Sequence, residues 1–158
     1  MVIKFLKNIV EHFCFLLVIV LSVVVFFQVF NRFILKAPWA WSEELAMLLF
    51  QWVVFLGAAV GVKRMSHFGI DLVVEKFSGK TRHIIELIVP LAIGAIAVTL
   101  IVEGFKLLKL TQYQLYTTMP FSHAWATAAM PVSGILMILY LLQHEVKIWK
   151  QNEERQSR

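Results

Sequence analysis

Long apolar runs, separated by short polar stretches, dominate the pattern of this chain. Four runs of 18 or 19 residues carry almost no charge. A helix needs about 20 apolar residues to cross a bilayer, and it is expected because it satisfies its own backbone polar groups in lipid. The runs lack the strict alternation of a membrane β-barrel strand. The pattern predicts an all-α integral membrane protein whose four transmembrane helices cover residues 12–30, 45–62, 84–102 and 124–142.

The composition excludes other broad classes of protein. Of the 158 residues, 59% are hydrophobic and 16% are charged, whereas an ordinary soluble domain is about 25% charged. A soluble fold of this size could not bury so much apolar surface, and disordered chains are poor in large apolar residues. Cys14 is the only cysteine, which excludes a disulfide-stapled scaffold. We therefore expect a single membrane domain over residues 1–158.

The basic residues are divided unequally between the two sides of the predicted bundle. With four spans, both termini and the loop 63–83 share one side, and that side holds 11 of the 15 Lys and Arg residues. Such a bias marks the cytoplasmic side. The net charge of +5 therefore records topology, and we expect no nucleic-acid partner. Because no small-x-small cleavage site follows the first run, we expect an uncleaved span and two cytoplasmic termini.

Amphipathic segments outside the spans are predicted to lie at the membrane surface. Residues 1–11 place polar and apolar positions at helical spacing, which predicts an interfacial helix, and residues 70–77 repeat the pattern more weakly. Residues 143–158 are expected to form a short polar cytoplasmic tail. Basic residues, tryptophans and one i,i+4 His–Asp pair are the candidate interfacial anchors. They are Lys4, Lys7, Trp39, Trp41, Arg64, His67 and Asp71.

The spans contain few residues that could bind a cofactor, an ion or a substrate. All five histidines fall at span ends or in loops, so a haem held by two facing imidazoles is not expected. Ionisable residues inside a span mark function by default, and here they are nearly missing. Pro90 and Pro131 are expected to bend their helices rather than to form a substrate site. We predict no catalytic residue, cofactor or metal in this chain, which is not expected to be an enzyme.

Two alternatives come from other functional classes. A self-contained four-helix exporter would carry a membrane-embedded carboxylate, and this chain has no convincing one. A membrane-anchor subunit of a respiratory enzyme is compatible with the pattern only if it holds no haem.

The start of the second run combines a helix-start signal with candidate contacts for a partner. Ser42 has the residue type of an N-cap, and Glu43 and Glu44 would lie in the positive first turn. Glu44 and Gln51 are seven residues apart and therefore share a helix face. Such a face could offer hydrogen bonds to a neighbouring subunit.

Small residues later in the chain indicate close helix packing. Gly57 and Gly61 form a GxxxG spacing, and the fourth run contains several alanines together with Ser133 and Gly134. GxxxG marks packing either within the bundle or against another chain. The candidate partner-interface residues are Ser42, Glu43, Glu44, Gln51, Gly57 and Gly61.

Six short segments occur in a characteristic order along this four-span chain. They are Gln28–Phe33, Pro38–Ala46, Phe55–Ala59, His67–Leu72, Met119–Pro120 and Ala129–Gly134. In order and spacing they resemble the small membrane subunit of tripartite ATP-independent periplasmic (TRAP) transporters. Because the chain ends soon after its fourth run, it resembles the type that is not fused to the large subunit.

This resemblance implies a function. Members of the family pair with a large multi-span subunit in the bacterial cytoplasmic (inner) membrane and receive substrate from a periplasmic binding protein. The complex imports organic acids of the sialic acid or C4-dicarboxylate class with a sodium gradient. The large subunit binds the substrate and the sodium ions and moves as an elevator, whereas the small subunit belongs to the static scaffold. We accordingly expect these two proteins and membrane lipids as partners, and no cofactor in this subunit.

Overall fold

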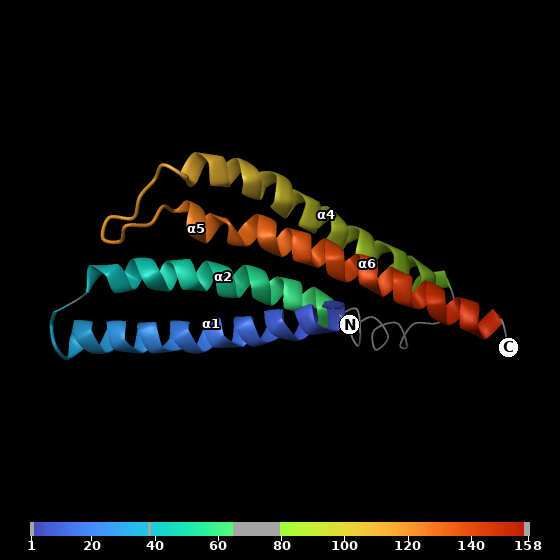
Figure 1. Cartoon of the computed structure of the whole chain (residues 1–158), viewed down its shortest axis with the longest axis horizontal. Helices are drawn as coiled ribbons and strands as arrows, with labels where there is room; N and C mark the ends of the chain where they lie inside the picture. Colours follow the sequence, from blue (N-terminus) through green and yellow to red (C-terminus); the bar gives the residue numbers. More distant parts are fainter. Residues whose placement is uncertain (1, 38, 65–79, 157–158) are drawn as a thin grey trace.

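A computed structural model describes the backbone of residues 2–37, 39–64 and 80–156, and the side chains of residues 9–37, 39–64 and 88–143. The described chain is helical apart from its connections (Figure 1). The helices are α1 (Val2–Phe33), α2 (Ala40–Arg64), α4 (Lys80–Thr111), α5 (Ala124–Thr127) and α6 (Ala129–Gln156).

Four of the helical segments are long and apolar enough to cross a membrane. Each contains an 18-residue window of high hydropathy with at most two charged residues. The predicted fold class, all-α with four candidate spans, is therefore confirmed. The segments are Ile9–Phe33, Ala40–Arg64, Ile88–Thr111 and Ala124–Gln143.

The helices lie side by side in the order α1, α2, α6, α4 (Figure 1). α1 packs on α2, α2 packs on α6, and α6 packs on α4, while α5 contacts both α2 and α4. Residues 34–39 and 112–123 connect helices at one end of the bundle, here called the Trp39 end. The opposite end, where α1 begins and α6 ends, is called the Glu11 end. Among the described helices, α1 is thus an outermost helix that packs mainly on α2.

The first helix differs from the expectation of two separate elements. Instead of an interfacial helix over residues 1–11 followed by a span, α1 runs without a break from Val2 to Phe33. At 1.5 Å per residue, its 32 residues extend for about 48 Å, which exceeds the roughly 30 Å of a hydrocarbon core. Continuous helical hydrogen bonding explains the missing break, since no proline or glycine lies within this stretch.

The fourth span also differs from its prediction. It begins with the short helix α5, and α6 starts anew at Ala129. Pro131 lies four residues after Thr127 and has no N–H to donate to the Thr127 carbonyl oxygen, so the interruption at Ala128 lies where the expected bend would fall. The expected polar tail is not a separate segment either, because α6 continues to Gln156. Pro90, by contrast, lies inside α4 as expected.

Small residues form the tightest part of the bundle. Ala59 of α2, Ala97 of α4 and Ser133 of α6 are fully buried. A Cβ atom added at Gly104 would lie 2.7 Å from Pro131 Cδ, and one added at Gly134 would lie 2.8 Å from the Ala97 carbonyl oxygen. α4 and α6 therefore approach so closely that these two positions admit only glycine. This outcome agrees with the close packing indicated by the small residues of the fourth run.

An ion pair joins α1 to α2 at the Glu11 end. Lys63 Nζ lies 2.7 Å from Glu11 Oε1, and the Lys63 side chain is only 10% exposed. Arg64 Nε lies 3.7 Å from the same carboxylate oxygen. The sequence pattern places Lys63 in a polar loop, whereas the structure places it in the last turn of α2. The spans therefore do contain a buried charge, and it is stabilised because its counter-ion lies on the neighbouring helix.

The close α4–α6 contact generates a stability prediction. We expect Gly134→Val to lower the free energy of unfolding by about 1–3 kcal/mol, because the added atoms overpack a tight contact. Thermal unfolding of the purified chain in detergent would measure this loss. Gly57→Val is the matched control, since a Cβ at Gly57 meets no atom within 4 Å. Equal destabilisation by the two variants would contradict the contact.

Candidate functional site

The first turn of α2 differs from the predicted helix start. α2 begins at Ala40, so Ser42 is not the N-cap but lies inside the first turn. Its hydroxyl donates a 2.6 Å hydrogen bond to the Trp39 carbonyl oxygen, and the residue is 97% buried. Ser42 therefore stabilises the turn from within and presents little surface to a partner.

Glu44 binds a loop of its own chain. Its carboxylate oxygens accept hydrogen bonds from Thr117 N at 2.8 Å and from Thr118 N at 3.0 Å. The Thr118 hydroxyl donates to the same carboxylate. Glu44 and these threonines are more than 70 residues apart in the chain. The carboxylate thus ties the loop 112–123 to the start of α2, so Glu44 has a structural function inside the subunit.

The loop 112–123 has an ordered conformation of its own. Leu115 and Ser122 form an isolated antiparallel bridge, and the rings of Tyr116 and His123 lie 3.9 Å apart between centroids. Burial raises the pKa of the Tyr116 phenol, and the negative charge of Glu44 raises it further. Both effects favour the neutral phenol over the phenolate.

A second link between α2 and this end of the chain is made by tryptophans. Trp52 Nε1 donates a 2.9 Å hydrogen bond to the Trp125 carbonyl oxygen. Around it lies an apolar pocket of about 270 Å³. Its lining residues are Leu45, Leu48, Trp52, Met119, Phe121 and Trp125.

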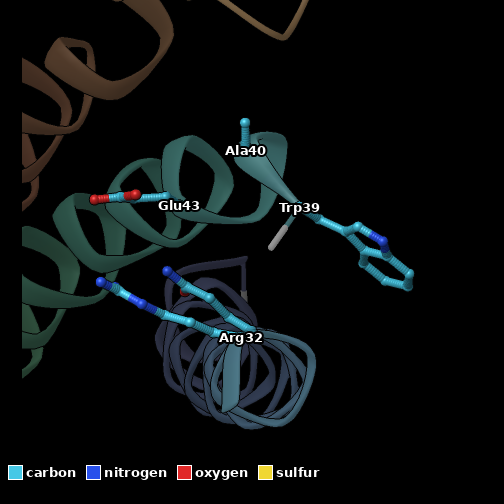
Figure 2. A pocket seen from close by; sticks show the side chains of 5 residues that line it. Arg32, Trp39, Ala40 and Glu43 are labelled. Atoms are coloured by element: carbon cyan, nitrogen blue, oxygen red, sulfur yellow. The ribbon is translucent and has the colours of Figure 1, made fainter. Parts of the chain in front are cut away.

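Glu43 lies in a different pocket, between the last turns of α1 and the first turn of α2. This pocket has a volume of about 310 Å³ and is lined by Gln28, Arg32, Trp39, Ala40 and Glu43. Figure 2 shows the side chain of Glu43 extending from α2 and that of Arg32 from α1, with their charged ends pointing to the same side. The two adjacent glutamates of the sequence therefore have separate surroundings.

One side of α2 has no neighbour among the residues that the structure describes. Gln51 is exposed there, together with Phe50 and Val54. A Cβ atom added at Gly57 or Gly61 would meet no atom within 4 Å. Within the described residues the GxxxG spacing therefore makes no close contact, whereas Gly104 and Gly134 do.

The predicted interfacial anchors are only partly covered by the structure. Trp39 and Trp41 are both exposed, and their rings stack at 5.6 Å between centroids. Arg64 is exposed beside Glu11. The side chains of Lys4 and Lys7, and both His67 and Asp71, lie outside the residues described.

Within residues 9–37, 39–64 and 88–143, the structure brings together no group of three or more His, Cys, Asp or Glu side chains that could hold a metal ion. The fixed features are two exposed pockets at the Trp39 end and an unpartnered side of α2. Together with the four candidate spans, this arrangement is typical of a helical membrane protein whose surfaces are open to other molecules.

Comparison with known proteins assigns the family. Residues 21–151 match the family of tripartite ATP-independent periplasmic transporters, DctQ component. The chain belongs to this family: it is a small permease subunit of a TRAP transporter, a multi-pass membrane protein and not an enzyme. A DctQ component of a tripartite system implies two partners, a large permease and a periplasmic binding protein.

Individual relatives carry out transport of different substrates. The chain is 30% identical to the sialic acid TRAP transporter small permease protein SiaQ of Vibrio cholerae, over 93% of this chain and 85% of the relative. It is 31% identical to the sialic acid TRAP transporter permease protein SiaT of Haemophilus influenzae, over 73% of this chain but only 19% of that protein. It is 35% identical to the C4-dicarboxylate TRAP transporter small permease protein DctQ of Pseudomonas aeruginosa, over 44% of this chain and 33% of the relative.

The Glu44 contact generates a prediction about the loop. We expect Glu44→Gln to speed hydrogen exchange at the Thr117 and Thr118 amides, because a neutral amide accepts weaker hydrogen bonds than a carboxylate. Hydrogen exchange followed by mass spectrometry, on the purified chain in detergent, would measure the change. Glu43→Gln is the matched control and is expected to leave these amides protected. Unchanged exchange in the Glu44 variant would contradict the contact.

Proposed function

We propose that this chain is the static scaffold subunit of a sodium-coupled TRAP transporter that imports organic acids of the sialic acid or C4-dicarboxylate class. The single observation that supports this most is the match to the DctQ family over residues 21–151. Two relatives, a sialic acid permease and a C4-dicarboxylate permease, support the substrate class.

The scaffold function is supported by two polar contacts near the ends of the described spans. Glu11 and Lys63 neutralise each other across α1 and α2, and Glu44 holds a loop at the Trp39 end. Each of these groups serves the subunit's own structure, whereas a transport site needs groups free to bind an ion or a substrate. In this proposal the partner large permease binds the substrate and the sodium ions, and this chain needs no cofactor.

We propose that this chain lies in the inner membrane of a bacterium, with both termini on the cytoplasmic side. The excess of Lys and Arg on the side of the termini supports this orientation. The Trp39 end then faces the periplasm, where the binding protein delivers substrate. The variant Lys36→Cys/Cys14→Ser carries its cysteine at the Trp39 end and is expected to be labelled from outside the cell. Labelling only from the cytoplasm would contradict this orientation.

The unpartnered side of α2 is the proposed contact for the large permease. A helix of the partner could approach closely at Gly57 and Gly61, which have open space before them. Exposed Gln51 could donate a hydrogen bond to it. Glu43 lies in the separate pocket with Arg32 and is not assigned to this contact. Ser42 and Glu44 contribute indirectly in this proposal, since they hold the first turn and the loop in place.

A reconstitution experiment tests the scaffold function. Proteoliposomes containing the large permease, the binding protein and this chain are expected to accumulate the organic acid when an inward sodium gradient is imposed. Omitting this chain is expected to abolish uptake, because the moving subunit then lacks a fixed support. Full sodium-driven uptake without this chain would refute the scaffold function.

Substitution of the glycine pair tests the contact surface. We expect Gly57→Leu/Gly61→Leu to lower the amount of large permease that co-purifies with this chain, because the leucine side chains keep a partner helix away. The chain itself should unfold at an unchanged temperature. The control Ala92→Leu/Ala95→Leu alters exposed small residues on α4 and should leave co-purification intact. Loss of the partner in both variants, or in neither, would count against the surface.

A further inference from the structure

The pocket between α1 and α2 at the Trp39 end lies where a lipid headgroup would lie. Its lining includes Arg32, one residue before the end of the first candidate span, and Ala40, the first residue of the second. Both spans thus begin or end at the pocket. Groups in this position meet the polar headgroups of a bilayer and not its hydrocarbon core.

The pocket contains one charge of each sign. Arg32 and Glu43 are both exposed, and within the part of the chain that the structure describes no ion pair joins them. The Arg32 guanidinium lies 6.0 Å from the Phe33 ring centroid. Figure 2 shows both charged ends pointing to one side of the pocket. A ligand that matches both groups carries an anion and a cation a short distance apart.

Lipid can reach this pocket from the side. Among the described helices, α1 packs mainly on α2, and none of its most apolar window is buried inside the subunit. Beside the pocket, Phe33 is 71% exposed and Ile34 is 63% exposed. The stacked Trp39 and Trp41 rings have the residue type that is enriched at headgroup depth. These apolar surfaces would contact acyl chains, which brings the attached headgroups to Arg32 and Glu43.

We propose that this pocket binds a zwitterionic phospholipid headgroup that combines a phosphodiester with a primary ammonium, as in phosphatidylethanolamine. The Arg32 guanidinium donates hydrogen bonds to the phosphate oxygens, a geometry that suits its planar array of donors. The ammonium donates to the Glu43 carboxylate. The Gln28 amide, which also lines the pocket, can donate to a further phosphate or ester oxygen.

The same chemistry disfavours other headgroups. Phosphatidylglycerol presents a phosphate without a cation, so that the Glu43 carboxylate would face an anion. The choline of phosphatidylcholine carries no N–H and cannot donate a hydrogen bond. Choline can be bound by aromatic faces, but Figure 2 shows the Trp39 ring directed away from the charged ends of Arg32 and Glu43. Selectivity therefore depends on the carboxylate.

Competition between lipids tests the proposal. The full chain, delipidated in detergent, is mixed with equal amounts of phosphatidylethanolamine, phosphatidylcholine and phosphatidylglycerol, and native mass spectrometry counts the lipids retained. We expect phosphatidylethanolamine to be retained in preference to the other two. Arg32→Ala should reduce retention of all three, and Glu43→Gln should lower the ratio of phosphatidylethanolamine to phosphatidylglycerol by about fivefold, a modest change suited to exposed charges.

The matched control is an exposed ion pair elsewhere. Lys106 and Glu103 of α4 lie 2.7 Å apart and line neither pocket. Glu103→Gln and Lys106→Ala should leave the lipid ratios unchanged, and all variants should unfold near the wild-type temperature. Glu43→Gln with a wild-type lipid ratio, or a control variant that changes the ratio equally, would overturn the proposal.

Two further arms separate the lipid from other occupants. Glycerophosphoethanolamine, the headgroup without acyl chains, should not displace bound lipid at equal concentration, and full displacement would make the site one for a soluble headgroup. If Arg32→Ala and Glu43→Gln reduced co-purification of the large permease while lipid retention stayed constant, the pocket would be a protein contact. Either result would overturn the lipid assignment, which does not rest on the scaffold function.

Discussion

Close approach of α4 and α6 is the contact on which the rest of this bundle depends. In a bilayer, moving an apolar side chain from lipid to a helix contact gains little free energy, because lipid is equally apolar. Helices therefore associate through tight packing and hydrogen bonds. Gly104 and Gly134 allow the backbones of α4 and α6 to meet. α2 then packs on α6, and α1 packs on α2. The position of α2 therefore depends on α6, and the position of α1 depends on α2.

Polar contacts hold the two ends of this apolar assembly. At the Glu11 end, the ion pair between Glu11 and Lys63 attaches α1 to α2. At the Trp39 end, Glu44 ties the loop 112–123 to α2. Both contacts join residues that are distant in the chain, and both lie near the ends of the spans, where water and headgroups make charge less costly than in the bilayer centre. Both contacts restrain how the helices lie against one another, as the proposed scaffold function requires.

Two surfaces of the described residues take part in neither the helix packing nor the polar contacts described above. The side of α2 with Gly57 and Gly61 has open space before it. The pocket with Arg32 and Glu43 has charges that are not paired to each other. A helix of the large permease suits the first surface because small residues permit close approach. A zwitterionic headgroup suits the second because it carries both charges.

The sequence by itself determined the fold class, the four candidate spans and the family, because apolar length and segment order are properties of the chain alone. The sequence could not distinguish the contacts of Glu43 from those of Glu44, because the two residues are adjacent and of the same type. Only the tertiary structure shows that Glu44 binds the Thr117 and Thr118 amides, whereas Glu43 lines a pocket with Arg32. It likewise decided that Lys63 is paired with Glu11 and that Gly134, not Gly57, makes a close contact. The physical reason is that lipid-facing and helix-facing positions are equally apolar in a membrane, so that only the packing of distant segments distinguishes them.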